Sequence, residues 1–376
     1  KRNWKRRLVI PNLKVIISGG GTGGHIFPAI AIANAIKKKR PDTEILFVGA
    51  KGRMEMTKVP EAGYKIVGLP IMGLQRSLTL KNLKFPFMLL KSMRKAKKLV
   101  KTFKPDIAIG VGGYASGPLL RAASAAKVPT LLQEQNSYAG LTNKILGKKA
   151  HKICVAYEGM EQFFPKDKIV ISGNPVREEM VNIDGKKDKA LAFFDLESSK
   201  KTLLIVGGSL GAWSVNEAVA QAISKFESAG IQVVWQTGKL YHPKAVEQAK
   251  GKESWLKVHE FIQRMDYAYA VADLVVSRAG AIAVSELCLV KKPSIFVPLP
   301  SAAEDHQTKN ANVLVGRNAA VIIKDNEVRE ELGEKVIDLI NNENELNRMS
   351  RQMEPMGFRD AADIIADEAI KLAIKA

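Results

Sequence analysis

The sequence predicts an α/β protein made of two doubly wound, Rossmann-like parallel-sheet domains. Apolar runs of strand length alternate with segments of helical periodicity along most of the chain. The pattern starts twice, at 14–36 and at 202–223, each time as a strand, a glycine-rich turn and a helix. The length of 376 residues also exceeds one ordinary core. Two such domains would turn the carboxyl ends of their strands toward a shared cleft.

The expected strands and boundaries follow from the same pattern. We expect a first domain over 1–173, a second over 174–355, with the hinge near Pro175, and a last helix over 361–374 that rejoins the first domain through 356–376. In the first domain the expected strands cover residues 15–18, 45–49, 66–69, 107–111, 130–133, 153–156 and 169–172. In the second domain one strand begins at residue 202, and the others cover 233–236, 256–261, 274–277, 294–297 and 321–323.

Composition limits the classes of partner. Lys and Arg outnumber Asp and Glu by 58 to 38, a net charge of +20, which favours anionic partners. Aromatic residues make up 6% and lie mostly in apolar runs, so we expect no nucleic acid. No apolar run approaches the roughly 18 residues of a membrane span. Two cysteines in apolar runs and a basic start without a signal sequence indicate a cytoplasmic protein.

The first glycine-rich turn, Gly19 to His25, can bring an anionic ligand to the start of a helix, where amides and the helix dipole favour negative charge. Its spacing also matches the dinucleotide fingerprint, which makes a nicotinamide-dependent oxidoreductase one alternative. That alternative is weakened because the next strand ends in Gly49, Ala50 and Lys51, where an acid should hold the ribose. A phosphate-binding Walker loop is excluded because no Gly-Lys-Ser/Thr follows.

Seven motifs follow one another along the chain: GGGTGGH at 19–25, GGYASGP at 112–118, QEQN at 133–136, GNPVR at 173–177, GGSLGA at 207–212, RAGAIAVSE at 278–286 and DHQTKN at 305–310. In this order they resemble the signature of the MurG family, from about Lys14 to the last helix. The resemblance implies an inverting glycosyltransferase of the GT-B fold. Its donor would be UDP-N-acetylglucosamine, bound mainly by the second domain. Its acceptor would be a lipid-linked N-acetylmuramoyl-pentapeptide, bound by the first.

For the donor, a loop entering a helix at 278–286 leaves amides open to a diphosphate, and Glu286 could accept both ribose hydroxyls. The resemblance gives this segment the same role. Ala283 stands where the family often has Thr, and Leu210 where it often has Gln. Arg177 could bind the diphosphate with two hydrogen bonds or be a surface residue near a hinge. The resemblance also implies that Ser209 contacts phosphate, that Ile262 lines the uracil, and that Asn136 and Gln307 contact the sugar. From the sequence alone, Ile262 would be a core residue, Asn136 a loop cap and Gln307 a residue on a helix surface. The other expected donor contacts are Ala281, Ile282, Val284 and Ser285, beside Glu286 and Ala283.

For the reaction, His25 is the expected base, since inversion requires an acceptor hydroxyl to lose its proton. A helix N-terminus disfavours the imidazolium cation and so favours the neutral, proton-accepting ring. His25 could instead order the turn or bind the acceptor pyrophosphate, and Glu134 is a second, weaker candidate base. Thr22, Gly23 and Gly24 are expected to contact substrate. The chain has no Asp-x-Asp, so neither a metal nor a cofactor is implied.

Residues 84–104 hold eight basic residues and no acid, led by an apolar Phe-Pro-Phe-Met-Leu-Leu run. Such a segment could insert at an anionic membrane surface, where each cation contributes about 1 kcal/mol, or could be an amphipathic helix with a solvated face. We therefore expect a peripheral enzyme at the cytoplasmic face of the cell membrane. A UDP-sugar epimerase or hydrolase of the same fold, which would need no lipid acceptor, is the main alternative. A basic scaffold without turnover is a further one.

Overall fold

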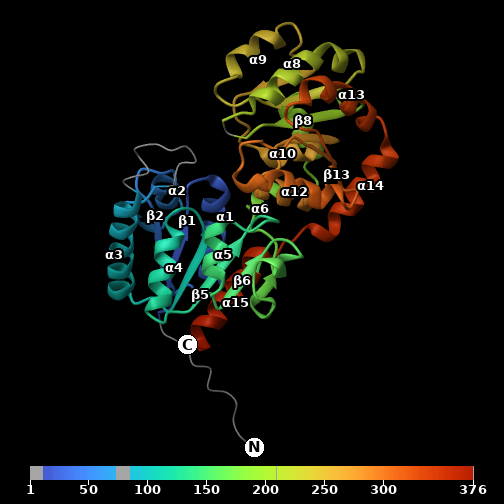
Figure 1. Ribbon diagram of the computed structural model, residues 1–376. Helices are drawn as coiled ribbons and strands as arrows, with labels where there is room; N and C mark the ends of the chain where they lie inside the picture. The colour runs from blue at the N-terminus through green and yellow to red at the C-terminus, as the bar shows by residue number, and fades with distance from the viewer. Residues whose placement is uncertain (1–11, 73–84, 209, 376) are drawn as a thin grey trace, which may run out of the picture. The chain divides into compact units, whose positions relative to one another are not determined.

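The computed structural model describes residues 12–72, 85–208 and 210–375. The chain divides into two compact units, an N-terminal unit of Lys1–Pro175 with Asp360–Ala376, and a C-terminal unit of Val176–Arg359 (Figure 1). The division falls two residues after the first expected boundary and four residues after the second.

The described residues of the N-terminal unit form a seven-stranded sheet in the order β3-β2-β1-β4-β5-β6-β7, in which every neighbouring pair is parallel. Its inner strands are largely buried, apolar and rich in β-branched residues, as expected for a sheet covered on both faces, while the edge strands β3 and β7 are only partly buried. They are β1 Lys14–Gly19, β2 Glu44–Ala50, β3 Lys65–Leu69, β4 Ile107–Gly112, β5 Thr130–Glu134, β6 Lys152–Val155 and β7 Ile169–Ile171.

The helices of this unit include the last helix of the chain, α15, which packs against α1. Ile365, Ala366 and Ala369 share a buried cluster with Ile26 and Ala29. Pro28 is the sixth residue of α1, because the helix already begins within the glycines. The helices are α1 Gly23–Lys39, α2 Glu55–Glu61, α3 Phe85–Phe103, α4 Ser116–Ala125, α5 Leu141–Gly147, the 3₁₀ turns η2 Met160–Gln162 and η3 Lys166–Lys168, and α15 Ala361–Lys375.

The described residues of the C-terminal unit form a six-stranded parallel sheet in the order β10-β9-β8-β11-β12-β13. Its strands are β8 Thr202–Val206, β9 Gln232–Gln236, β10 Leu256–His259, β11 Leu274–Ser277, β12 Ser294–Phe296 and β13 Ala320–Ile322. Its helices are α6 Glu178–Val181, α7 Lys187–Phe194, α8 Trp213–Ser228, α9 His242–Ala249, α10 Met265–Val271, α11 Ala281–Leu289, η4 Ala303–Asp305, α12 His306–Val315, α13 Val328–Ile340, α14 Glu343–Met353 and η5 Glu354–Met356.

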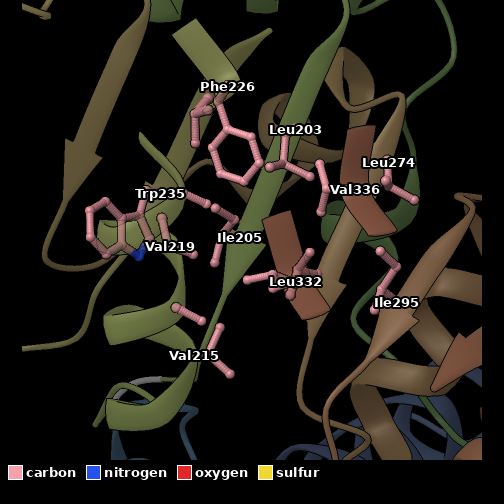
Figure 2. Close-up of a cluster of buried hydrophobic side chains, with 14 of the residues drawn as sticks. Leu203, Ile205, Val215, Val219, Phe226, Trp235, Leu274, Ile295, Leu332 and Val336 are labelled. Atoms are coloured by element: carbon pink, nitrogen blue, oxygen red, sulfur yellow. The ribbon is translucent and has the colours of Figure 1, made fainter. Parts of the chain in front are cut away.

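One core of the C-terminal unit joins β8 to α8 and α13 (Figure 2). Leu203 and Ile205 of β8 pack with Phe226 of α8 and with Leu332 and Val336 of α13, all fully buried. Burying an aliphatic or aromatic side chain of this size contributes about 1.5–3 kcal/mol. This packing fixes the helix that follows the second glycine turn against the sheet.

In both units the strand order reverses beside the first strand. β1 lies between β2 and β4, and β8 lies between β9 and β11. In open parallel sheets, ligands bind outside the carboxyl ends of the strands at such switch points. The glycine turns after β1 and β8, the Gly112–Gly113 turn after β4 and the 278–280 loop after β11 all start there. The topology therefore places the candidate residues of each unit at one edge of its sheet.

Candidate active site

A carboxylate of the protein itself occupies part of the first glycine turn. Glu55, 1% exposed at the start of α2, accepts the Gly21 N–H through Oε2 and the Ala50 N–H through Oε1, both at 2.9 Å. A Cβ on Gly20 would come within 2.2 Å of Oε1 of Glu55. Gly20 therefore makes room for this carboxylate, and the Gly21 amide binds an internal anion. The later residues of the turn are the ones placed to meet a ligand.

Those later residues form the start of α1. Thr22 is the exposed N-cap residue and makes no side-chain capping hydrogen bond. Gly23 and Gly24 occupy the first helical turn, where amides precede the first intrahelical hydrogen bond. A Cβ on Gly24 would meet no atom closer than 3.6 Å. The arrangement suits an oxyanion held by backbone amides.

His25 follows these glycines and lies against the end of β4. Its Nδ1 is 3.0 Å from Oε1 of Gln135. A Cβ on Gly112 would lie 2.6 Å from both Cε1 and Nδ1 of the ring, so only glycine fits there, and its φ of +109° also favours glycine. The Gly20 N–H donates to the Gly112 carbonyl at 3.3 Å and joins the two turns. His25 is thus positioned by three separate segments.

Glu134, the other candidate base, is 2% exposed and accepts hydrogen bonds at both carboxylate oxygens. Oε1 accepts from the backbone and side-chain N–H groups of Asn136 at 3.1 and 3.2 Å. Oε2 accepts from the Gly140 N–H at 3.1 Å and the Asn143 amide at 2.8 Å. These four bonds hold the 136–140 loop and favour a structural role, so His25 remains the stronger candidate.

In the C-terminal unit, α11 begins after β11 with Gly280 as N-cap and without a side-chain cap. Ala281, Ile282 and Ala283 supply the first-turn amides, since the first intrahelical bond runs from the Val284 N–H to the Gly280 carbonyl. The Val284 side chain is buried, and the Ser285 hydroxyl donates to the Ala281 carbonyl at 3.0 Å. From this stretch it is mainly backbone amides that can meet a diphosphate.

Glu286 lies on the same helix, and Tyr269 of α10 donates its hydroxyl to Oε2 at 3.0 Å. Burial raises the pKa of Glu286 above its ordinary value, while the Tyr269 hydrogen bond and the charge of Arg177 act in the opposite direction. Burial, followed by the charge of Glu286, raises the pKa of Tyr269. The expected Arg177 and Glu286 thus belong to one electrostatic group, together with a tyrosine that the sequence did not single out.

Ile262 has a side chain that is 3% exposed and packs in a core cluster. Its N–H donates to Oε1 of Gln236 at 2.9 Å, while Nε2 of Gln236 donates to the Gly208 carbonyl at 3.2 Å. The buried Gln236 therefore ties the loop expected at uracil to the second glycine turn. Of the predicted site residues, Ser209 lies outside the described residues.

Gln307, in the first turn of α12, accepts the Leu299 N–H at 2.9 Å through its side-chain oxygen. Its amide nitrogen still carries the donors that a sugar hydroxyl can use. Just before α12, Glu304 and Asp305 have φ of +51° and +54°. Non-glycine residues adopt this conformation at a cost, which is common where a loop presents a binding residue.

No pattern in the sequence assigns a separate role to Gln135, Glu55, Tyr269 or Gln236. Gln135 could have been found, because it follows the last residue of β5 and lies two positions after Gln133, so an extended backbone would turn both amides to the same side. The others depend on contacts between residues 17 to 34 positions apart. Within the described residues, no group of three His, Cys, Asp or Glu side chains is placed to hold a metal ion. None of the described helices combines the length and apolar character of a membrane span.

Comparison with known proteins finds relatives along most of the chain. The glycosyltransferase family 28 N-terminal domain matches residues 15–155, and the family 28 C-terminal domain matches residues 202–365. A Parabacteroides distasonis protein is 55% identical over 365 residues, covering 96% of this chain and 99% of that protein. It is named UDP-N-acetylglucosamine–N-acetylmuramyl-(pentapeptide) pyrophosphoryl-undecaprenol N-acetylglucosamine transferase.

Two solved structures are also similar. Acinetobacter baumannii MurG has a TM-score of 0.77 and 28% identity, covering 96% of this chain and 99% of that chain. The UDP-GlcNAc 2-epimerase of Neisseria meningitidis, bound to UDP-GlcNAc, has a TM-score of 0.65 and 15% identity, covering 96% and 100%. The epimerase shares the fold alone at that identity.

Proposed function

The chain belongs to glycosyltransferase family 28, and on that basis we propose that it transfers N-acetylglucosamine from UDP-N-acetylglucosamine to a lipid-linked N-acetylmuramoyl-pentapeptide, with inversion at the sugar carbon. The observation that carries this proposal is the full-length similarity to a protein named for that reaction. The product would be the disaccharide-pentapeptide precursor of peptidoglycan.

For the donor, we propose that the α11 amides and Arg177 hold the diphosphate, and that Glu286 accepts the ribose hydroxyls. The uncapped start of α11 supports the first assignment, because a helix N-terminus favours negative charge. The half-buried carboxylate that accepts the Tyr269 hydroxyl supports the second. Ile262 would line the uracil through its backbone, and Ser209, Asn136 and Gln307 would contact phosphate and sugar.

For the chemistry, we propose that His25 is the base. The acceptor hydroxyl gives its proton to the imidazole, its oxygen attacks the anomeric carbon, and the bond from that carbon to the diphosphate oxygen breaks. UDP leaves with the bonding electron pair. The amides at Thr22, Gly23 and Gly24 are suited to the acceptor pyrophosphate. No step in this scheme calls for a metal.

For the acceptor, we propose that α3 docks on the anionic cytoplasmic face of the membrane. Ser92, Ala96 and Val100 form the buried stripe of α3, at a spacing of four residues. The opposite face is exposed and carries two apolar residues followed by cations: Phe87, Leu90, Lys91, Arg94, Lys97, Lys98 and Lys101. Such a face can insert its apolar end and hold anionic headgroups with the rest.

The test is incubation with labelled UDP-N-acetylglucosamine and the lipid-linked acceptor, with analysis of the product linkage. A β-linked disaccharide on the lipid supports the proposal. Release of UDP in equal amounts without acceptor would support a hydrolase or an epimerase instead. In the His25→Ala variant we expect transfer to fall by about 10²-fold or more while UDP binding persists. Equal transfer by that variant would remove His25 from the mechanism.

A further inference from the structure

Three buried amide side chains form a chain of hydrogen bonds next to His25. Gln133, Gln135 and Asn174 are each at most 2% exposed. Gln135 donates through Nε2 to the Val111 carbonyl at 2.6 Å and to Oε1 of Gln133. Gln133 donates to Oδ1 of Asn174 at 2.9 Å, and Asn174 donates back to the Gln135 carbonyl at 3.0 Å. The network uses both ends of every amide.

The contacts with backbone carbonyls determine which end of each amide is nitrogen. A carbonyl oxygen only accepts, so the Gln135 atom beside the Val111 carbonyl must be Nε2. By the same argument, the Asn174 atom beside the Gln135 carbonyl must be Nδ2. Oδ1 of Asn174 then faces Gln133, so the Gln133 atom that contacts it must be Nε2. Turning any one amide around would place two donors or two acceptors together, which costs about 1–3 kcal/mol for a buried group. The atom of Gln135 that faces His25 is therefore Oε1.

An amide oxygen has no hydrogen to donate, so Nδ1 of His25, 3.0 Å away, must carry one. A neutral imidazole with hydrogen on Nδ1 has its lone pair on Nε2. The close approach of Gly112 to Cε1 and Nδ1 leaves little room for the ring to turn over. Gly112, at the end of β4, thus limits the orientation of the ring, and Gln135, in the loop after β5, determines the position of its proton.

We propose that Gln135 is a positioning residue that holds His25 as the Nδ1–H tautomer and so makes Nε2 the atom that receives the acceptor proton. The proposal rests on the proposed role of His25 as base. In the proton step the hydroxyl proton moves to Nε2, and the resulting imidazolium keeps its Nδ1–H bond to Gln135. Gln133 and Asn174 act through Gln135, since they hold its amide in the required orientation.

The test is nitrogen NMR of the full chain labelled with ¹⁵N-histidine, at a pH where the ring is neutral. The chain has five histidines, and the His25 signals are those lost in His25→Gln. We expect Nδ1 to be protonated and Nε2 unprotonated in the unmodified protein. A ring protonated at Nε2 would overturn the proposal, and this measurement needs no variant of Gln135.

The second arm is Gln135→Met, which keeps the length of the side chain and removes the amide. We expect a mixture of the two tautomers and a fall in kcat of about tenfold or more, with unchanged UDP affinity. The control is Gln162→Met, whose exposed amide donates only to the nearby Gly159 carbonyl at 2.8 Å. An unchanged tautomer in Gln135→Met would also overturn the proposal. Unchanged transfer by His25→Ala would instead defeat the role of His25 as base and leave the tautomer result standing.

Discussion

The hydroxyl of Tyr269 lies 3.0 Å from Oε2 of Glu286 and donates a hydrogen bond to it. Tyr269 is 3% exposed, so its hydroxyl is held in place by the core around α10. A carboxylate in a buried setting depends on such donors to stay ionised. This bond therefore connects the core of the C-terminal unit to the residue proposed to bind the ribose.

The first prediction concerns Tyr269→Phe. We expect UDP affinity to fall about tenfold, because a hydrogen bond to a charged group contributes about 1.5–3 kcal/mol. Isothermal titration of UDP measures the change. Tyr267→Phe, the same substitution two residues away on α10, is the control, since Tyr267 packs under Arg264, 3.5 Å from ring centroid to guanidinium carbon. Equal losses in both variants would show that the Tyr269–Glu286 bond is not responsible.

The second prediction concerns the pH dependence of UDP binding. Because burial raises the pKa of Glu286, its carboxylate is protonated at a higher pH than an ordinary glutamate. The protonated group can no longer accept two ribose hydroxyls, so affinity should decline as pH falls through that raised pKa and level off above it. UDP itself titrates, and the informative quantity is the ratio of wild type to Glu286→Gln. A ratio that does not vary with pH would contradict the role of Glu286.

The third prediction concerns Glu55→Gln. The variant replaces one carboxylate oxygen by an amide nitrogen, which faces either the Gly21 or the Ala50 N–H and leaves that donor buried without an acceptor. We expect the free energy of unfolding of the N-terminal unit to fall by about 1–3 kcal/mol, measured by urea denaturation. Glu61→Gln on the same helix removes only an exposed ion pair with Lys58 and should cost far less. Equal stability of the two variants would refute this account of the glycine turn.

Every strand expected from the sequence is present, and each expected end lies within two residues of the observed end. Strands buried in parallel sheets are continuous apolar runs. Residues such as 15–17 and 274–276 can therefore be recognised as strands without knowing which strands they pair with. The glycine turns are equally local. For the same reason, the positions of His25 and Glu286 at strand-to-helix turns could be predicted. The family could be predicted as well, because its motifs lie in these turns.

The remaining features depend on three-dimensional packing. Periodicity shows that 361–374 is helical but not that Ile365 lies beside α1, because an apolar stripe does not specify its partner. Glu55 accepts the Gly21 N–H although the two residues are 34 positions apart. Its short helix carries no sequence motif that would predict this contact. Glu134 and Gln135 are neighbours in sequence at the end of β5, yet Glu134 binds the 136–140 loop and Gln135 contacts His25.

The last prediction concerns the exposed face of α3. Reversing three of its cations, Lys97→Glu, Lys98→Glu and Lys101→Glu together, should weaken binding to vesicles with anionic lipid by about tenfold or more, because each cation near such a surface contributes favourably. Sedimentation with vesicles of rising phosphatidylglycerol content measures this. Binding of the unmodified protein should also weaken with salt, since its electrostatic part is screened.

The control for α3 carries the same change of net charge on the C-terminal unit: Lys200→Glu, Lys250→Glu and Lys335→Glu, all at exposed positions. If net charge alone attracted the protein to the membrane, both triple variants would lose binding equally, and the docking role of α3 would be refuted. If α3 is the docking element, only its own variant loses binding. Both variants should keep the UDP affinity of the unmodified protein, because none of the six lysines lies among the proposed donor contacts. Transfer to a lipid-linked acceptor in vesicles should then fall only in the α3 variant. Transfer to a water-soluble, short-chain acceptor, which needs no membrane, should fall in neither variant.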